Sequence, residues 1–340
     1  MMSQVASRRE AAERRIVDMY GPVQRDIVEV EDLLRQELRS DDPFVDELVK
    51  YAFRIGGKRL RPALLLLSAK AIGQVSRDHI VLAAVVEMIH TATLVHDDVL
   101  DEASVRRHLD TVNARWNNES SVLLGDFLFT HSFYLASTLE STYACRTIGR
   151  ATNIVCDGEL RQVRNMGNYE LGEEEYLQII DAKTAELCAC CCRLGAHYAL
   201  SGQTEADRVL EERLGSFGRN LGIAFQIVDD LLDVVGDEAT TGKSLGTDLQ
   251  KHKATLPVIR LLELAPRTER EQLIALLNSS GPRRCEQLRT QLQHSGAIEY
   301  ARAKARWYAD QATADLADLP TNPSLEVLRS LTEFVVARQL

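Results

Sequence analysis

Apolar residues recur at helical spacing along most of the chain, and this periodicity limits its possible folds more than any other feature. Between residues 81 and 99, apolar side chains follow one another at alternating steps of four and three: Val81, Val85, Met88, Ala92, Val95 and Val99. Such a stripe covers one face of an α-helix. A similar stripe runs through 221–235, and residues 300–316 and 323–340 are also helix-like.

Patterns typical of β-strands, in which apolar and polar residues alternate between turn residues, are nearly absent, and only 8 of 340 residues are proline. We therefore expect an all-α protein with a single domain over 1–340, in which 1–20 forms a flexible or peripheral segment. Loops are expected near 20–22, 55–57, 73–77, 165–173, 200–205, 236–248, 265–267 and 317–323.

The chain is acidic, with 40 Lys plus Arg against 50 Asp plus Glu and a net charge of −10. This balance argues against nucleic acid as a partner, because phosphate backbones attract basic surfaces. An anionic substrate would need local basic clusters or metal ions to hold it.

Neither a signal-peptide core nor an apolar run long enough to span a membrane is evident, and we expect a cytoplasmic protein. The seven cysteines suit a reducing compartment, and four of them crowd into 188–192. No histidine stands near that run to complete a zinc site, so we expect the cysteines to pack in the core.

Two acidic clusters share one spacing: Asp97, Asp98 and Asp101, then Asp229, Asp230 and Asp233. On a helix the three carboxylates of each cluster lie within one arc, at about 0°, 100° and 40°. Their mutual repulsion would be relieved by Mg²⁺, which binds one or two carboxylates together with phosphate oxygens. A solvated acidic helix face is the alternative, but both clusters interrupt otherwise apolar stretches.

These clusters and several shorter motifs resemble the trans-polyprenyl diphosphate synthase family, from about residue 20 to the end. The motifs occur in the order and at the spacing of the family: Gly-Gly-Lys-Arg-Leu-Arg-Pro at 56–62, His90, His96, Arg106-Arg107, Gly125-Asp126, Gly-Glu-Leu-Arg-Gln at 158–162, Lys183-Thr184, Gln226 and Gly242-Lys243. The resemblance implies a helical bundle of the isoprenoid synthase type around a deep central cavity. It also implies a homodimer.

The resemblance further implies two diphosphate-binding sets. Isopentenyl diphosphate would be bound by Lys58, Arg61, His90 and Arg107. An allylic diphosphate such as farnesyl diphosphate would be bound by Arg106, Lys183, Thr184, Gln226, Lys243 and Lys253. Lys58 and Arg61 also stand near a predicted helix start at Pro62, where free backbone N–H groups favour anions. His90 lies seven residues before Asp97, on the same helix face.

The loop 236–253 contains three glycines and three lysines directly after the second cluster. It could close over the phosphates as a lid, or simply connect two helices. Three residues depart from the family pattern: His108 and His252 stand where glycine is usual, and Ser244 replaces a common proline. None of these changes removes a charged ligand, but each could alter the local loop geometry.

The implied reaction joins isopentenyl diphosphate head-to-tail to the allylic substrate. Asp97, Asp101 and Asp229 would hold Mg²⁺, with three ions expected and Mn²⁺ as a substitute, while Asp98, Asp230 and Asp233 support them. Metal and lysine charge, including that of Lys183, would neutralise the leaving diphosphate. The product would be delivered to a membrane.

Three rival functions are a terpene cyclase, a non-catalytic subunit of a heteromeric synthase and a helical metal-binding or scaffold protein. Cyclases usually alter the second aspartate cluster and lack an isopentenyl site, and non-catalytic subunits tend to lose an aspartate motif. This chain keeps both clusters and the basic motif at 56–62. A scaffold protein would not explain the basic set.

Product length would be set by Ala92 and Thr93, one helical turn before Asp97. Short-chain members often carry bulky aromatic residues there, whereas small residues leave a passage for the growing tail. We expect a product between hexaprenyl and decaprenyl, centred on octaprenyl. A short-chain farnesyl or geranylgeranyl diphosphate synthase is the alternative.

Overall fold

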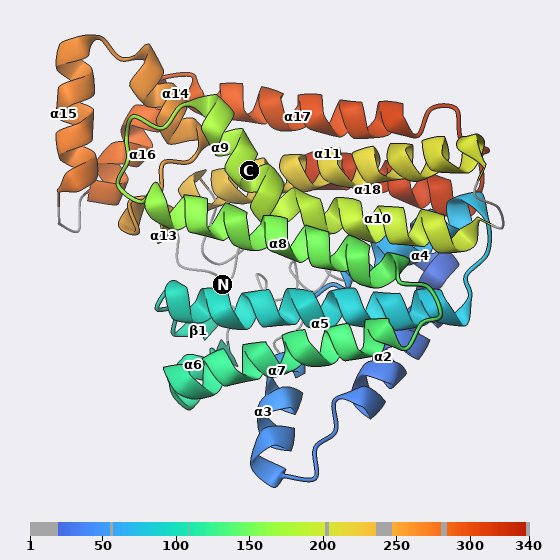
Figure 1. Ribbon diagram of the computed structural model, residues 1–340. Coiled ribbons are helices and arrows are strands. Elements are labelled where there is room, and N and C mark those ends of the chain that lie inside the picture. The colour runs from blue at the N-terminus through green and yellow to red at the C-terminus, as the bar shows by residue number, and fades with distance from the viewer. Residues whose placement is uncertain are drawn as a thin grey trace, which may run out of the picture. The chain divides into compact units, whose positions relative to one another are not determined.

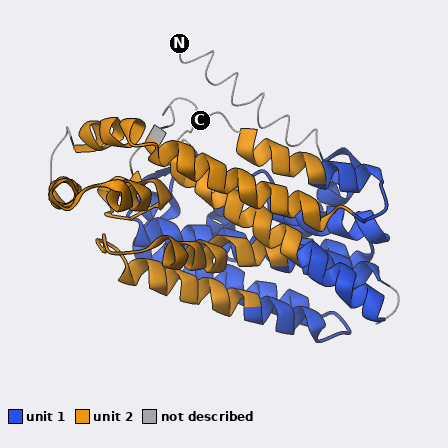
Figure 2. Cartoon of the chain, turned by 90° about the horizontal axis from the view of Figure 1, so that it is seen from above, with its two compact units in different colours: residues 1–150, 190–215, 318–328 blue, residues 151–189, 216–317, 329–340 orange. Residues whose placement is uncertain are grey.

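The computed structural model describes residues 20–54, 57–107, 109–200, 204–235, 247–279 and 284–337. These residues are almost entirely helical, which confirms the all-α prediction (Figure 1). They group into two compact units, shown in Figure 2. Unit 1 takes the described residues of 1–150, 190–215 and 318–328, and unit 2 those of 151–189, 216–317 and 329–340. That the chain forms a single domain stays a prediction. The N-terminal segment expected over 1–20 lies outside the described residues, except for Tyr20.

Unit 1 is built mainly from the first half of the chain. Its elements are η1 (Gly21–Val23), α2 (Gln24–Glu37), α3 (Pro43–Arg54), α4 (Leu60–Ile72), α5 (Arg77–Leu100), β1 (Val105–Arg106), β2 (Leu109–Asp110), α6 (Val112–Arg115) and α7 (Asn118–Ser137). Four further helices contribute residues to both units: α8 (Tyr143–Arg164), α10 (Glu186–Ala199), α11 (Glu205–Val235) and α18 (Pro323–Ala337).

Helix α5 is the core helix of unit 1 and packs against α7, α4 and α2 (Figure 1). All residues from His79 to Ile89 are buried, so this helix is covered on every side rather than on one stripe. The helix is long enough to span a membrane, and an 18-residue window within it has a mean hydropathy of 1.5. However, 78% of that window is buried inside the structure. Such burial is typical of a core helix.

The antiparallel pair of β1 and β2 was not expected from the sequence. Val105 pairs with Asp110 and Arg106 with Leu109. Arg107 adopts a left-handed backbone conformation with φ +53°. His108, one of the departures from the family pattern, lies outside the described residues.

Unit 2 is built from the second half of the chain. Its own elements are α9 (Glu173–Ile180), the π-helical turn η2 (Asp181–Ala185), α13 (Thr247–Gln250), α14 (Leu256–Leu264), α15 (Arg267–Asn278), α16 (Arg284–His294) and α17 (Ala297–Asp315). Helix α14 packs against α17, α16 and α9. The apolar stripe predicted for α11 is buried, since Ala224, Val228 and Leu231 are at most 1% exposed.

Most predicted helix boundaries agree with the structure. The stripe at 81–99 lies within α5, and the helix-like segments at 300–316 and 323–340 correspond to α17 and α18. The expected loop at 20–22 is largely the short helix η1, because Pro22 favours a first helical turn. Much of the expected loop at 236–248 lies outside the described residues, and α13 begins at its end.

Gly195 is required by close packing between α10 and α4 in unit 1. A Cβ atom at this position would overlap the backbone carbonyl oxygen of Leu65, which cannot move away without disturbing α4. Gly149 in α8 provides a contrast, because a Cβ atom there would meet only the Phe133 ring, at an ordinary 3.8 Å.

We predict that Gly195→Ala lowers the free energy of unfolding by about 1–3 kcal/mol, the usual cost of overpacking. Gly149→Ala is the matched control and should raise it by about 0.5–1 kcal/mol, because alanine favours a helix interior. Urea denaturation followed by circular dichroism measures both changes. Equal stabilisation by the two substitutions would contradict the packing argument.

Candidate active site

The first aspartate cluster lies at the C-terminal end of α5, in unit 1. Asp97 and Asp98 belong to its last turn, and Asp101 is the residue that ends the helix. Asp98 is only 3% exposed and binds Arg106, whose Nε and Nη2 atoms both lie 2.8 Å from its Oδ1 atom. Burial raises the pKa of Asp98, although the Arg106 guanidinium opposes that shift. Arg106, which the resemblance assigned to the allylic set, thus pairs with the first cluster.

The four residues predicted to bind isopentenyl diphosphate also belong to unit 1. Arg107 lies against the basic loop before α4, because a Cβ atom on Gly57 would be only 2.6 Å from its Nη2 atom. Lys58 follows Gly57 in the chain, and Arg61 lies in the first turn of α4. A side chain at position 57 would displace Arg107, which explains the glycine there.

His90 lies within the field of this basic group. Burial, and then the positive charges of nearby guanidinium groups, hold its pKa well below 6.5; the contributing residues are Arg61, Arg107, Arg106 and Arg59. The imidazole is therefore neutral at pH 7, with one N–H donor and one acceptor nitrogen. The structure thus brings Arg61, His90 and Arg107 into one electrostatic group, and their binding of isopentenyl diphosphate stays a prediction.

The second aspartate cluster lies in α11, within unit 2, and Asp230 is the centre of a buried hydrogen-bond network. Thr184 Oγ1 donates to Gln226 Oε1 at 2.8 Å, and Gln226 Nε2 donates to Asp230 Oδ1 at 2.8 Å. Tyr176 Oη donates to Asp230 Oδ2 at 2.6 Å. Burial, and then the charge of Asp248, raise the pKa of Asp230. Sequence reasoning found Thr184, Gln226 and Asp230 but missed Tyr176, which stands in an ordinary apolar stripe.

Asp233 holds the start of α13. Its carboxylate accepts hydrogen bonds from the Thr247 backbone N–H, the Thr247 hydroxyl and the Asp248 backbone N–H, at 3.2, 2.7 and 3.0 Å. These bonds satisfy donors that a helix start leaves unpaired. Asp233 thereby connects the second cluster to the segment that carries Lys253.

Lys253 follows α13 and is largely buried, with its Nζ atom 3.7 Å from Asp248 Oδ1. The preceding residue, His252, has φ +55°, in the left-handed region that favours glycine. Its Nδ1 atom lies 3.1 Å from the Tyr169 hydroxyl oxygen. Position 252, where the family usually has glycine, thus has a left-handed backbone conformation although it is a histidine. The histidine side chain adds a contact with Tyr169. Lys243 and Ser244 lie outside the described residues.

Lys183 occupies the π-helical turn η2, and its Nζ atom lies 2.6 Å from Glu159 Oε1. Glu159 belongs to the Gly-Glu-Leu-Arg-Gln motif, so the two motifs meet in unit 2. A π turn inserts one extra residue into a helix and often marks a functional position. Thr184, the next residue, turns its hydroxyl to Gln226.

The two positions expected to control product length differ in exposure. Ala92 is fully buried, whereas Thr93 is partly exposed and donates its hydroxyl proton to the His90 carbonyl oxygen at 2.8 Å. A bulky residue at 92 would therefore disturb the core of unit 1. Position 93, being partly exposed, accepts a larger side chain more readily.

The donor chemistry of the two clusters fits a hard divalent cation, because every ligand they offer is a carboxylate oxygen. Among the described residues, no three Asp, Glu, His or Cys side chains are grouped as a complete metal site. Mg²⁺ characteristically keeps few protein ligands and takes the rest from substrate oxygens and water. Asp98, Asp230 and Asp233 accept hydrogen bonds from protein donors, and their supporting role stays a prediction.

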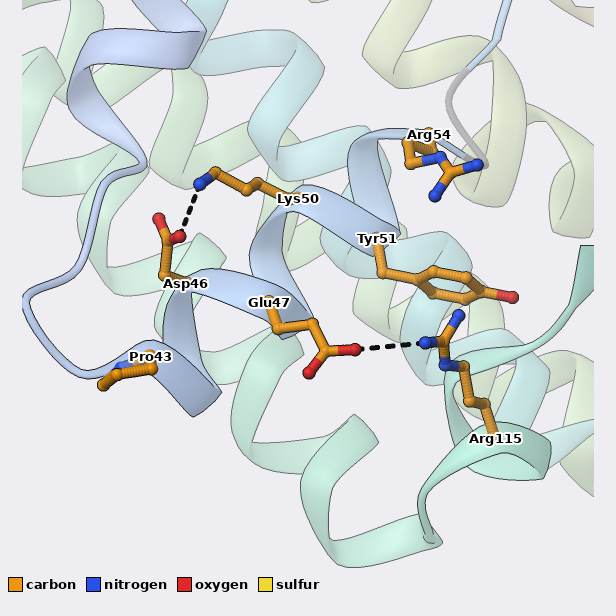
Figure 3. A pocket seen from close by; sticks show the side chains of 7 residues that line it. All are labelled: Pro43, Asp46, Glu47, Lys50, Tyr51, Arg54 and Arg115. Atoms are coloured by element: carbon orange, nitrogen blue, oxygen red, sulfur yellow. Dashed lines mark hydrogen bonds and ion pairs between the residues drawn. The ribbon is translucent and has the colours of Figure 1, made fainter.

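Unit 1 also has a surface cavity of about 440 Å³ (Figure 3). Its lining residues are Pro43, Asp46, Glu47, Lys50, Tyr51, Arg54 and Arg115. Two ion pairs, Lys50 with Asp46 and Arg115 with Glu47, neutralise most of its charge. None of the residues predicted to bind substrate lines this cavity.

Comparison with known proteins places these motifs in a family. Residues 42–293 match the family model described as polyprenyl synthetase. The chain belongs to the polyprenyl synthetase family. It is 36% identical to octaprenyl diphosphate synthase of Escherichia coli K12, covering 92% of this chain and 96% of the relative. Such relatives transfer prenyl groups, so the chain is an enzyme of the polyprenyl diphosphate synthase class.

Solved structures of polyprenyl synthetases share the fold. A decaprenyl diphosphate synthase from Rhodobacter capsulatus has a TM-score of 0.88 and 34% identity, covering 96% of this chain and 99% of that one. A polyprenyl synthase from Caulobacter crescentus CB15, complexed with calcium and isoprenyl diphosphate, also has a TM-score of 0.88. Its identity is 35%, and the match covers 95% of this chain and 98% of that one.

We predict that Tyr176→Phe lowers the turnover number about tenfold. The lost hydrogen bond to the buried Asp230 carboxyl is worth about 1–3 kcal/mol, and 1.4 kcal/mol corresponds to a factor of ten. Steady-state prenyl-transfer assays measure the change. Tyr300→Phe is the control, because that hydroxyl binds Glu173 at 2.6 Å, outside the network. Wild-type turnover in Tyr176→Phe would show that Asp230 does not depend on this bond.

Proposed function

We propose that this chain is a Mg²⁺-dependent trans-prenyltransferase that condenses isopentenyl diphosphate with an allylic diphosphate to make a long-chain polyprenyl diphosphate. The observation that carries the proposal is the basic group around His90. A chain of net charge −10 gathers Arg59, Arg61, Arg106 and Arg107 around one neutral imidazole. That imidazole lies on the same helix as the first aspartate cluster. Such a concentration of guanidinium groups suits a diphosphate.

In this mechanism Lys58, Arg61, His90 and Arg107 bind the diphosphate of isopentenyl diphosphate and orient its double bond. Lys183, Thr184, Gln226, Lys243 and Lys253, with Arg106, hold the allylic diphosphate. Asp97, Asp101 and Asp229 would hold Mg²⁺, which supplies positive charge for the departing diphosphate. The apolar helices exclude water from the allylic cation while the double bond attacks it. The departing diphosphate takes up the proton that is lost.

The proposal also covers the oligomeric state, the location and the product length. The resemblance supports a homodimer, the cysteine content suits the cytoplasm, and the product would be passed to a membrane. Octaprenyl and decaprenyl diphosphate synthases among the relatives support a product of hexaprenyl to decaprenyl length. Thr93 is small and partly exposed beside the first cluster, as a long product requires.

One incubation tests the proposal as a whole. The purified protein is mixed with isopentenyl diphosphate, farnesyl diphosphate and Mg²⁺, and the products are identified by mass spectrometry. We expect inorganic diphosphate and a polyprenyl diphosphate of about eight isoprene units. A cyclic hydrocarbon would indicate a terpene cyclase instead, and no turnover would favour a non-catalytic subunit.

We predict that EDTA abolishes prenyl transfer and that added Mg²⁺, or Mn²⁺, restores it. Asp97→Ala and Asp229→Ala should each lower turnover at least ~100-fold, because a lost metal ligand removes several kcal/mol of leaving-group stabilisation. Asp310→Ala, on the exposed side of α17, is the control and should keep wild-type turnover. Full activity in the presence of EDTA would rule out the two-cluster mechanism.

We predict that Thr93→Tyr shortens the product to farnesyl or geranylgeranyl diphosphate while the first condensation continues. A phenol ring would fill a passage beside α5, and each helical turn of about 5.4 Å accommodates roughly one isoprene unit. Mass spectrometry of the products provides the measurement, with Thr290→Tyr on exposed α16 as the control. Ala92→Phe is the weaker test, because overpacking at this buried position costs about 1–3 kcal/mol of stability. A long product from Thr93→Tyr would contradict the role of position 93.

A further inference from the structure

Glu87 is a buried acidic residue that the predicted site does not use. It lies in the middle of α5, three residues before His90, and is 1% exposed. Its neighbours Val86 and Met88 are fully buried. Because a buried carboxylate is costly unless it is paired, a partner must compensate its charge.

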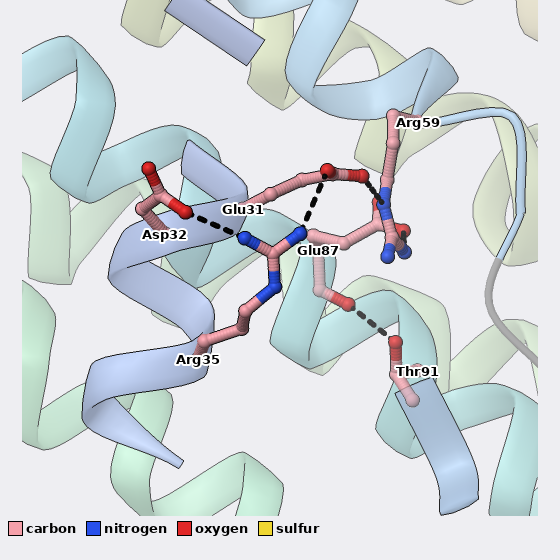
Figure 4. Close-up of polar contacts among 6 residues, drawn as sticks. All are labelled: Glu31, Asp32, Arg35, Arg59, Glu87 and Thr91. Atoms are coloured by element: carbon pink, nitrogen blue, oxygen red, sulfur yellow. Dashed lines mark hydrogen bonds and ion pairs between the residues drawn. The ribbon is translucent and has the colours of Figure 1, made fainter. Parts of the chain in front are cut away.

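That partner is Arg59, in the basic loop before α4 (Figure 4). Arg59 Nη1 lies 2.6 Å from Glu87 Oε1, and the arginine side chain is itself 16% exposed. Glu31 on α2 lies farther away, with its Oε1 atom 3.5 Å from Arg59 Nε, and is 35% exposed. Glu31 also contacts Arg35, at 3.4 Å. Glu87 is therefore the closer and less solvated of the two carboxylates that hold Arg59.

The backbone of Arg59 is in an unfavourable conformation for a residue with a side chain. Its φ of +52° and ψ of +33° lie in the left-handed region. Such a conformation persists only where surrounding contacts maintain it. Lys58 comes directly before Arg59 and Arg61 two residues after it, so the conformation of Arg59 affects how the chain passes from one to the other.

The second oxygen of Glu87 and the hydroxyl of Tyr20 are also buried, and neither has a hydrogen-bond partner among the described residues. The charge of Glu87 contributes, after burial, to the raised pKa of Tyr20. Arg59 is thus the cation on which this carboxylate depends. The dependence is mutual, because Glu87 offsets part of the charge that Arg59 adds to the guanidinium groups around His90.

We propose that Glu87 is a positioning residue that anchors Arg59 and so arranges Lys58 and Arg61 for the diphosphate of isopentenyl diphosphate. The inference rests on the proposed function. Glu87 does not touch substrate in this scheme. It acts through Arg59, and its loss should weaken the binding of isopentenyl diphosphate while leaving the allylic site intact.

The test compares Glu87→Gln with Glu31→Gln, which removes the other carboxylate on the same arginine. We expect Glu87→Gln to raise the KM for isopentenyl diphosphate about tenfold, with the KM for farnesyl diphosphate within twofold of wild type. Glu31→Gln should leave both values within twofold. Arg59→Gln should reproduce the effect, and the double variant Arg59→Gln/Glu87→Gln should be no worse than the more affected single variant.

Two further variants and readouts separate positioning from a merely structural role. Glu87→Asp keeps the charge and should recover part of the lost affinity. If Glu87→Gln fails to fold, Arg59→Gln replaces it, because Arg59 is the more exposed of the two residues. The KM values of Arg59→Gln are then compared with those of Glu31→Gln. Equal rises of both KM values, a fall in kcat alone, or additive effects in the double variant would overturn the proposal.

A binding measurement keeps this test distinct from a failure of the proposed function. Inorganic diphosphate is titrated calorimetrically into wild type and Glu87→Gln in EDTA, so that no metal ion can bring the diphosphate to the aspartate clusters. We expect about tenfold weaker binding in the variant, whether or not wild type turns over. Equal affinities would overturn the role of Glu87. Absence of turnover by wild type, with this difference intact, would overturn only the assigned reaction.

Discussion

Repulsion between like charges is the constraint on which the candidate site residues of each unit depend. Unit 1 gathers guanidinium groups around His90, and each unit carries three closely spaced aspartates. Neighbouring residues compensate part of this charge before any ligand binds, as Arg106 does for Asp98 and Glu87 for Arg59. Because such pairs are largely buried, they hold their geometry more firmly than exposed ion pairs would.

Much of the fold could be predicted because helical periodicity is a local property. The stripe at 81–99 marked α5, and the aspartate spacing placed both clusters on helices. The roles of the site residues could be assigned only through the family resemblance. A single residue such as Lys183 has no sequence pattern around it that would distinguish it from an ordinary surface lysine. The pairing of the hairpin strands β1 and β2 went unpredicted, because two-residue strands are too short to show alternation.

The contacts between motifs could not be predicted from spacing. Tyr176 lies 54 residues from Asp230 in the chain, and nothing near it in the sequence separates a hydrogen-bonding tyrosine from a packed one. Arg106 was assigned to one substrate, but its partner Asp98 becomes visible only when the hairpin folds back on α5. The difference in burial between Ala92 and Thr93 likewise arises from tertiary packing rather than from either residue type.

The π-helical turn at Asp181–Ala185 has a consequence for how this region can change. Because the turn holds one residue more than an α-helical turn, its adjacent side chains can reach different partners: Lys183 contacts Glu159, and Thr184 contacts Gln226. Deletion of a single residue here would rotate everything that follows in α10 by about 100° relative to α9. The buried cysteines at 190–192 would then face new neighbours. Substitutions in this segment are thus tolerated far more readily than changes in its length.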